Sequence, residues 1–160
     1  MFTKILVPLD GSPLAERALP IAVGLAKLTG GAITLVHAVE ASGLPGTDKT
    51  DAEVEVVRKG EAYVEGVEQR LRSEGVNVRS AVWYGPPVFA ITEAARIGGT
   101  DVIVMSTHGR GGLGRLVLGS VADAVIRRTR VPVLLVREAE APLEEPLPGP
   151  AAVPRSPEGA

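Results

Sequence analysis

Residues 101–120 read DVIVMSTHGRGGLGRLVLGS, and this stretch decides the fold. Its first six residues, Asp101–Ser106, are apolar almost throughout, which is typical of a strand buried on both faces of a helix-covered parallel sheet. Glycine-rich sequence follows, and a helix is predicted to begin at Ser120, with Asp123 completing a capping box. Strand, turn and helix in this order predict one unit of an α/β fold.

Similar units extend in both directions from this stretch. Runs of apolar and β-branched residues predict four further strands, at Lys4–Leu9, Ala32–Ala38, Asn77–Tyr84 and Val131–Arg137. Helical patterns lie between them, at Ser12–Leu28, Asp51–Glu74 and Pro87–Gly99. The sequence therefore predicts a single doubly wound, five-stranded parallel sheet of Rossmann-like order 3-2-1-4-5, with its ligand crevice between the first and fourth strands.

Two features of the predicted helices concern their regularity. Pro20 lies inside the first helix and should kink it or force a local irregularity, because proline has no N–H to donate. The second helix repeats apolar residues along one stripe, at Val57, Val64, Val67 and Leu71.

Length, composition and net charge indicate how many domains the chain has and which classes of partner it lacks. The chain has 160 residues, enough for one domain, which we assign to residues 1–137. Residues 138–160 are rich in Pro, Glu and Ala without apolar periodicity, so we expect a disordered tail. The formal net charge of −2 argues against nucleic acid and anionic membranes as partners.

Cysteine and histidine content narrow the chemistry. The chain has no cysteine, which excludes thiol catalysis and Cys-ligated zinc and fits a reducing compartment. Its two histidines make a His-rich metal site unexpected. The N-terminal apolar run is broken at Pro8 and is too short for a signal peptide or a membrane span. We therefore expect a cytoplasmic protein.

The glycine-rich segment is the strongest functional signal. Glycines at positions 109, 111, 112, 114 and 119 allow close approach of the backbone to a ligand, and successive N–H groups in such turns bind anions. Arg110 and Arg115 add positive charge, and the start of the following helix adds free N–H groups. A chain of phosphates suits this set of donors, although a flexible connector is the alternative interpretation.

Two familiar nucleotide motifs match only in part. Gly109–Gly114 fits G-x-G-x-x-G, but no acidic residue follows about 20 positions later, as a dinucleotide site requires. The segment Gly114–Ser120 resembles a P-loop but lacks the lysine before its Ser/Thr. NAD and a standard P-loop NTPase are both disfavoured.

The turn after the first strand, Pro8–Ser12, faces the glycine-rich segment in the predicted strand order. Asp10 is a candidate for a ribose hydroxyl or a phosphate-bound metal, and equally for a helix cap, whereas Ser12 is mainly a cap. His108 adjoins the phosphate turn, and a loop histidine bonded to backbone is the preferred interpretation.

These residues resemble the ATP-binding branch of the universal stress protein family. That branch carries glycine, two residues, glycine, nine residues, and then glycine with Ser/Thr. Here Gly109, Gly119 and Ser120 match the spacing, and Ser106 replaces the first glycine. Further similarity lies in VPLDGS (7–12), LVHA (35–38) and VPVLLVR (131–137).

The resemblance implies an ATP site, with Mg²⁺ accompanying the nucleotide. Pro8 and Asp10 would flank the adenosine, and Ala38 would offer its backbone to the adenine. Met105 and Ser106 would line the base and ribose. The phosphates would be held by Gly109, Arg110, Gly111, Gly112, Gly119, Ser120 and Val121, with Asp10 as the metal contact.

The sequence thus favours an ATP-binding regulatory or stress-response protein that hydrolyses ATP slowly, if at all. One alternative is a slow ATPase that uses the same pocket. Another is a nucleotide-free dimeric interaction module. In either case the apolar strand at Val131–Arg137 lies at a sheet edge and predicts a homodimer.

Overall fold

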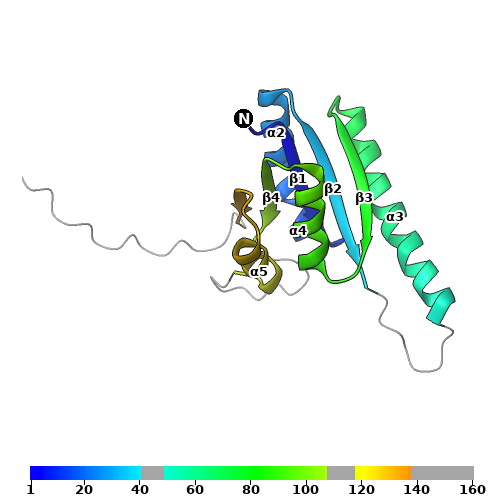
Figure 1. Ribbon diagram of the computed structural model, residues 1–160. Helices are drawn as coiled ribbons and strands as arrows, with labels where there is room; N and C mark the ends of the chain where they lie inside the picture. The colour runs from blue at the N-terminus through cyan, green and yellow to red at the C-terminus, as the bar shows by residue number, and fades with distance from the viewer. Residues whose placement is uncertain (41–48, 108–117, 138–160) are drawn as a thin grey trace, which may run out of the picture.

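The computed structural model describes residues 1–40, 49–107 and 118–137, and they form one five-stranded, all-parallel sheet (Figure 1). The strands lie in the order β3-β2-β1-β4-β5, which confirms the predicted topology. Their bounds are β1 Lys4–Leu9, β2 Ala32–Val39, β3 Val78–Tyr84, β4 Val102–Ser106 and β5 Val133–Val136. The helices are α1 Pro13–Glu16, α2 Ala18–Thr29, α3 Lys49–Ser73, α4 Pro87–Gly98 and α5 Ser120–Arg128.

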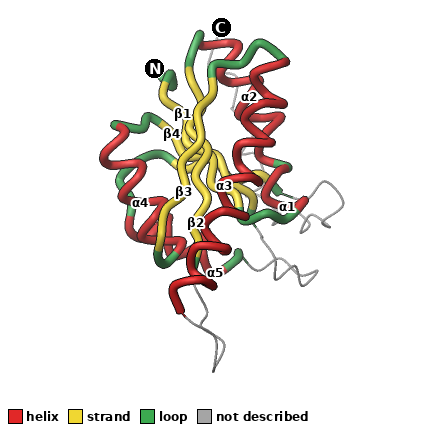
Figure 2. The backbone as a smooth tube through the Cα atoms, turned by 90° about the vertical axis from the view of Figure 1, so that its right-hand side faces the viewer, coloured by secondary structure: helices red, strands yellow, loops and turns green. Residues whose placement is uncertain are grey.

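Helices cover both faces of the sheet (Figure 2). Alternate residues of β1 separate two cores, because side chains along a strand point to opposite faces. Ile5 and Val7 join the core beneath α1, α2 and α3, whereas Leu6 joins the core beneath α4 and α5. The stripe predicted for α3 packs on the first of these cores through Val67 and Leu71. Burial on both sides explains why these strands read as continuous apolar runs.

The first predicted helix is two helices, which corrects the single span from Ser12 to Leu28. The break lies at Arg17, between α1 and α2. Pro20 is the physical cause, because a continuous helix would need its missing N–H to bond the carbonyl of Glu16. The predicted irregularity is confirmed, and it falls one turn before the proline. Strands β3, β4 and β5 begin one or two residues later than predicted.

The Asp101 carboxylate joins the amino-terminal ends of β1 and β4. Asp101 Oδ2 accepts hydrogen bonds from the Thr3 N–H at 2.9 Å, the Thr3 hydroxyl at 3.1 Å and the Lys4 N–H at 2.9 Å. These hydrogen bonds hold the pKa of Asp101 below its ordinary value, and the bond from the Lys4 N–H has the largest effect.

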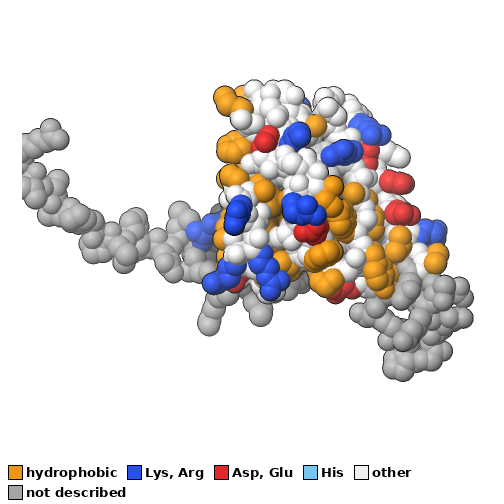
Figure 3. Space-filling model, viewed as in Figure 1, with side chains coloured by type: hydrophobic (Ala, Val, Ile, Leu, Met, Phe, Trp, Pro, Cys, Tyr) orange, Lys and Arg blue, Asp and Glu red, His pale blue; other side chains and the backbone are white. Residues whose placement is uncertain are grey.

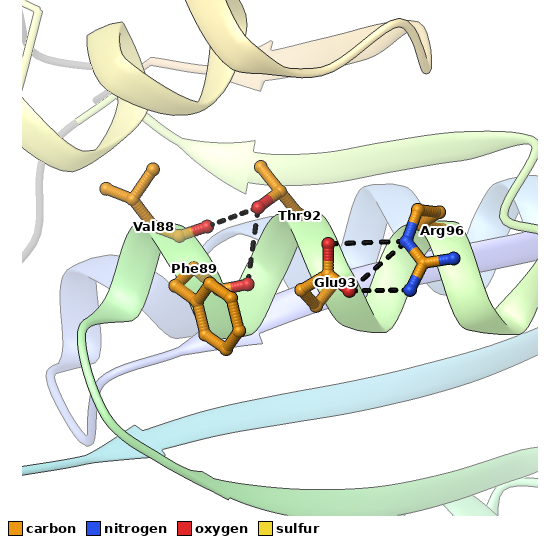
Figure 4. Close-up of polar contacts among 5 residues, drawn as sticks. All are labelled: Val88, Phe89, Thr92, Glu93 and Arg96. Carbon is orange, nitrogen blue, oxygen red and sulfur yellow. Dashed lines mark hydrogen bonds and ion pairs between the residues drawn. The ribbon is translucent and has the colours of Figure 1, made fainter.

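The outer surface of α4 satisfies its own polar groups (Figure 4). The Thr92 hydroxyl donates to the carbonyls of Val88 at 2.9 Å and Phe89 at 3.2 Å, and Arg96 pairs with Glu93 at 2.7 Å. The helix is therefore held on the sheet by its apolar side. Lys and Arg side chains gather at the α5 end of the same face (Figure 3).

Among the described helices, none is both long and apolar enough to cross a membrane.

Candidate functional site

A cavity of about 890 Å³ lies at the carboxyl ends of β1, β2 and β4. It occupies the position predicted for a doubly wound sheet, where the winding reverses. Its walls include every predicted site residue that the structure describes, namely Pro8, Asp10, Ala38, Met105, Ser106, Gly119, Ser120 and Val121. The other predicted residues, Gly109, Arg110, Gly111 and Gly112, lie outside the described residues.

The turn after β1 is fixed by its own side chains. Asp10 Oδ1 accepts hydrogen bonds from the Ser12 N–H at 2.9 Å and the Ser12 hydroxyl at 2.6 Å. Ser12 Oγ in turn accepts from the Ala15 N–H at 3.1 Å, so Ser12 caps α1 as predicted. Asp10 supports the cap and also lines the cavity.

The glycine-rich segment is anchored at both ends. The Thr107 carbonyl accepts a hydrogen bond from the Gly119 N–H at 2.8 Å, which joins the residue after β4 to the residue before α5. The Thr107 N–H donates to the Val136 carbonyl at 3.0 Å, which ties the same point to β5. The start of α5 is therefore held at the end of β4, beside the cavity.

The N-cap of α5 is Gly119, and the prediction that Ser120 caps the helix in a box with Asp123 is wrong. No side chain caps this end, because Ser120 is already the first helical residue and Asp123 pairs with Arg127 at 2.9 Å. The first helical bond runs from the Asp123 N–H to the Gly119 carbonyl, so the preceding amides have no intrahelical acceptor. Ser120, Val121 and Ala122 carry these amides and line the cavity.

Gly119 has an ordinary backbone, with φ −59° and ψ 147°. Nothing in this conformation requires glycine, because a φ near −60° is open to every residue. Gly119 itself lines the cavity next to the first-turn amides of α5. A helix start with free amides and a positive dipole end is a site for an anion.

Away from the start of α5, the part of the cavity on the α4 side of the sheet is apolar. Its lining includes Val36, Pro87, Ile91 and Met105. Between this apolar part and α5 lie the ends of β1 and β4, which carry Asp10 and Ser106. The cavity thus offers an apolar surface, hydrogen-bonding groups, and amides without an intrahelical acceptor.

The cavity also has a wall on the α3 side, which sequence reasoning missed. His37 Nδ1 lies 2.8 Å from the Leu9 carbonyl oxygen. Tyr63 packs edge-on against it, with ring centroids 5.5 Å apart, and donates its hydroxyl to Glu16 at 3.0 Å. Burial first, and then this bond, raises the pKa of Tyr63. Helical spacing alone did not distinguish Tyr63 from an ordinary core residue.

Charged groups around the cavity are few. Lys59 is the cation among its described lining residues, and it lies 3.5 Å from Glu55. The described residues contain no group of three His, Cys, Asp or Glu side chains that would hold a metal ion by themselves.

Comparison with known proteins identifies the family. The family model described as the universal stress protein family matches residues 1–137. Universal stress protein MJ0531 of Methanocaldococcus jannaschii is 32% identical over 142 residues, covering 86% of this chain and 84% of that protein. The solved structure of MJ0577, from the same organism, superposes with a TM-score of 0.78 at 28% identity, covering 86% of this chain and 97% of its own.

Two more distant structures share the fold and carry a nucleotide. One is a universal stress protein in complex with cAMP, at TM-score 0.65 and 23% identity, covering 84% of this chain and 96% of its own. The other is an Arabidopsis thaliana family protein with AMP bound, at TM-score 0.65 and 18% identity, covering 86% of this chain and 93% of its own. The family model, the relatives and the fold agree over the whole described sheet, and the chain belongs to the universal stress protein family.

Proposed function

We propose that this protein binds ATP in the cavity at the carboxyl edge of the sheet and acts as a nucleotide-dependent regulatory protein. One observation carries the proposal. A single cavity joins the free first-turn amides of α5 to an apolar surface on the α4 side, with Asp10 and Ser106 between them. This order of surfaces suits the phosphates, the base and the ribose of a nucleotide in turn.

The phosphate end depends on α5. The amides of Ser120 and Val121 have no acceptor among the described residues, and the dipole of the helix favours negative charge at this point. The AMP and cAMP bound by two family members support an adenine nucleotide as the ligand class. ATP is our choice because the glycine-rich segment, which precedes α5 in the sequence, carries further amides and two arginines.

Mg²⁺ would enter with the nucleotide. Asp10 lines the cavity, and its carboxylate would be the protein's contribution to the metal. One carboxylate is sufficient for this role, since Mg²⁺ is commonly held by one or two carboxylates together with substrate phosphates and water.

We propose that hydrolysis is slow, so that ATP is a retained ligand. Fast phosphoryl transfer needs a positioned nucleophile and positive charge on the terminal phosphate. The Asp10 carboxylate accepts a hydrogen bond from the Ser12 hydroxyl within its own turn. The Tyr63 hydroxyl donates to Glu16, and the Lys59 ammonium forms an ion pair with Glu55. We place this function in the cytoplasm, in keeping with a chain without cysteine.

Calorimetry with ATP tests the proposal, using the unaltered protein and the variant Gly119→Val. Valine suits the backbone of Gly119, so the variant should fold. Its side chain would stand before the amides of α5, and ATP binding should fall at least tenfold. Gly24→Val is the matched control, because a Cβ at Gly24 in α2 meets no atom within 4 Å.

Each of three outcomes is informative. Loss of ATP affinity in Gly119→Val, with normal affinity in Gly24→Val, supports phosphate binding at α5. Absence of any ATP binding by the unaltered protein would favour the nucleotide-free interaction module. Equal affinities in all three proteins would place the ligand elsewhere.

A further inference from the structure

The cavity continues beyond the proposed nucleotide region to the α3 side of the sheet. We call this part the α3 compartment, and its walls are Ala15, His37, Val39, Val56, Gly60 and Tyr63. His37 and Val39 lie at the carboxyl end of β2, and both approach Gly60 of α3. The compartment therefore lies on the opposite face of the sheet from Met105 and Ile91, which pack in the core beneath α4.

His37 presents a buried acceptor to this compartment. Its Nδ1 lies 2.8 Å from the Leu9 carbonyl, which can only accept, so Nδ1 carries the proton. In the neutral ring Nε2 is then an acceptor. The side chain is only 8% exposed, and no residue that the structure describes donates to Nε2. A buried acceptor of this kind needs a donor from water or a ligand.

The position of Nε2 is marked by Gly60. A Cβ placed on Gly60 would lie 2.9 Å from His37 Cδ2 and 3.4 Å from Nε2. This edge of the imidazole therefore faces α3 at a point that belongs to the cavity wall. A side chain at position 60 would fill the approach to it.

Neighbouring polar groups do not serve this acceptor. The Tyr63 hydroxyl is directed to Glu16 Oε1 at 3.0 Å, and Glu16 is further held by Arg70 at 2.7 Å. What Tyr63 offers the compartment is its ring, which stands at 63° to the imidazole. Ala15, Val39 and Val56 add apolar surface to this wall, and Lys59 of α3 also lines the cavity.

We propose that the α3 compartment binds small phenols, meaning an aromatic ring with one hydrogen-bond donor at its edge. The ring would pack against Tyr63 and Val56, and its hydroxyl would donate to Nε2 of His37. Aromatic pairs in edge-to-face contact and a satisfied buried acceptor both favour this class. The site does not depend on the nucleotide, which would occupy the α4 side and the start of α5.

Nuclear magnetic resonance of the histidine rings, with phenol and anisole as probes, tests the proposal. The chain has two histidines, so the His37 ring signals are readily assigned. Phenol should perturb the Nε2 signal of His37 at millimolar concentration. Anisole has the same ring but cannot donate, and it should bind about three- to tenfold more weakly for the loss of one hydrogen bond.

Two variants of α3 control for location. Val56→Phe should fill the compartment and reduce phenol affinity at least fivefold. Val54→Phe makes the same change at a residue that is 62% exposed and not part of the cavity wall, so it should leave phenol binding unchanged.

The results separate this proposal from nucleotide binding. Phenol binding that disappears in Val56→Phe and persists in Val54→Phe supports the compartment, whether or not ATP binds the same protein. Equal affinity for phenol and anisole would overturn the role of His37. Phenol binding that is unaffected by Val56→Phe, or no phenol binding at millimolar concentration, would overturn the site.

Discussion

Replacement of Gly60 by alanine tests the contact between α3 and the end of β2. The new Cβ would stand 2.7 Å from Val39 Cγ1 and 2.9 Å from His37 Cδ2. Neither atom can easily yield, because Val39 is buried and stiff at χ1, and the His37 ring is held by its bond to Leu9. We expect Gly60→Ala to destabilise the protein even though alanine is the better helix former.

Two opposing terms set the magnitude. Glycine to alanine inside a helix gains about 1 kcal/mol. Forcing a methyl group into a packed core costs about 1–3 kcal/mol. The net loss of stability in Gly60→Ala should therefore be about 0–2 kcal/mol. Gly66 lies in the same helix, and a Cβ there meets no atom within 4 Å, so Gly66→Ala should show only the gain.

Urea denaturation followed by Trp83 fluorescence measures both variants against the unaltered protein. The two should differ by about 1–3 kcal/mol, with Gly66→Ala the more stable. The reasoning fails if Gly60→Ala is stabilised as much as Gly66→Ala, since that would mean that α3 does not approach β2 as closely as the structure shows. A changed denaturant slope in either variant would exclude the comparison as a measure of packing.

Three further outcomes are expected. Asp101→Asn should lower stability at neutral pH, and because the folded pKa of Asp101 is depressed, its deficit should shrink as pH falls through that pKa; equal stability at neutral pH would contradict this. A chain ending at Arg137 should keep its melting temperature, whereas a large decrease would show that the tail supports the fold. The protein should be a dimer paired through the edge strand β5, and light scattering should report a monomer for Leu134→Lys; a monomeric unaltered protein would refute the pairing.

The hydrophobic pattern of the sequence predicted the sheet because a strand buried on both faces is apolar at consecutive positions. The continuous apolar runs of β1 and β4 each serve two cores, so their composition alone identified central strands. The strand order was predicted by analogy with Rossmann-like sheets, because the right-handed crossover rule limits the possible topologies without selecting one. Local capping was less secure: Ser12 caps α1 as predicted, but Gly119 and not Ser120 caps α5. The two positions differ by one residue, and the bond from the Asp123 N–H to the Gly119 carbonyl makes Gly119 the N-cap.

The sequence by itself determined the class of fold, the edge of the sheet where the cavity lies, and the residues of β1, β4 and α5 that line it. Each of these depends on short-range patterns of apolar, glycine and capping residues. Only the tertiary structure decided what faces His37. That environment needs α3 to cross β2 at Gly60 and to bring Tyr63 beside the imidazole, although these residues lie more than 20 positions away along the chain. Contacts between remote segments depend on how two elements pack together, and neither element carries a local pattern that records its partner.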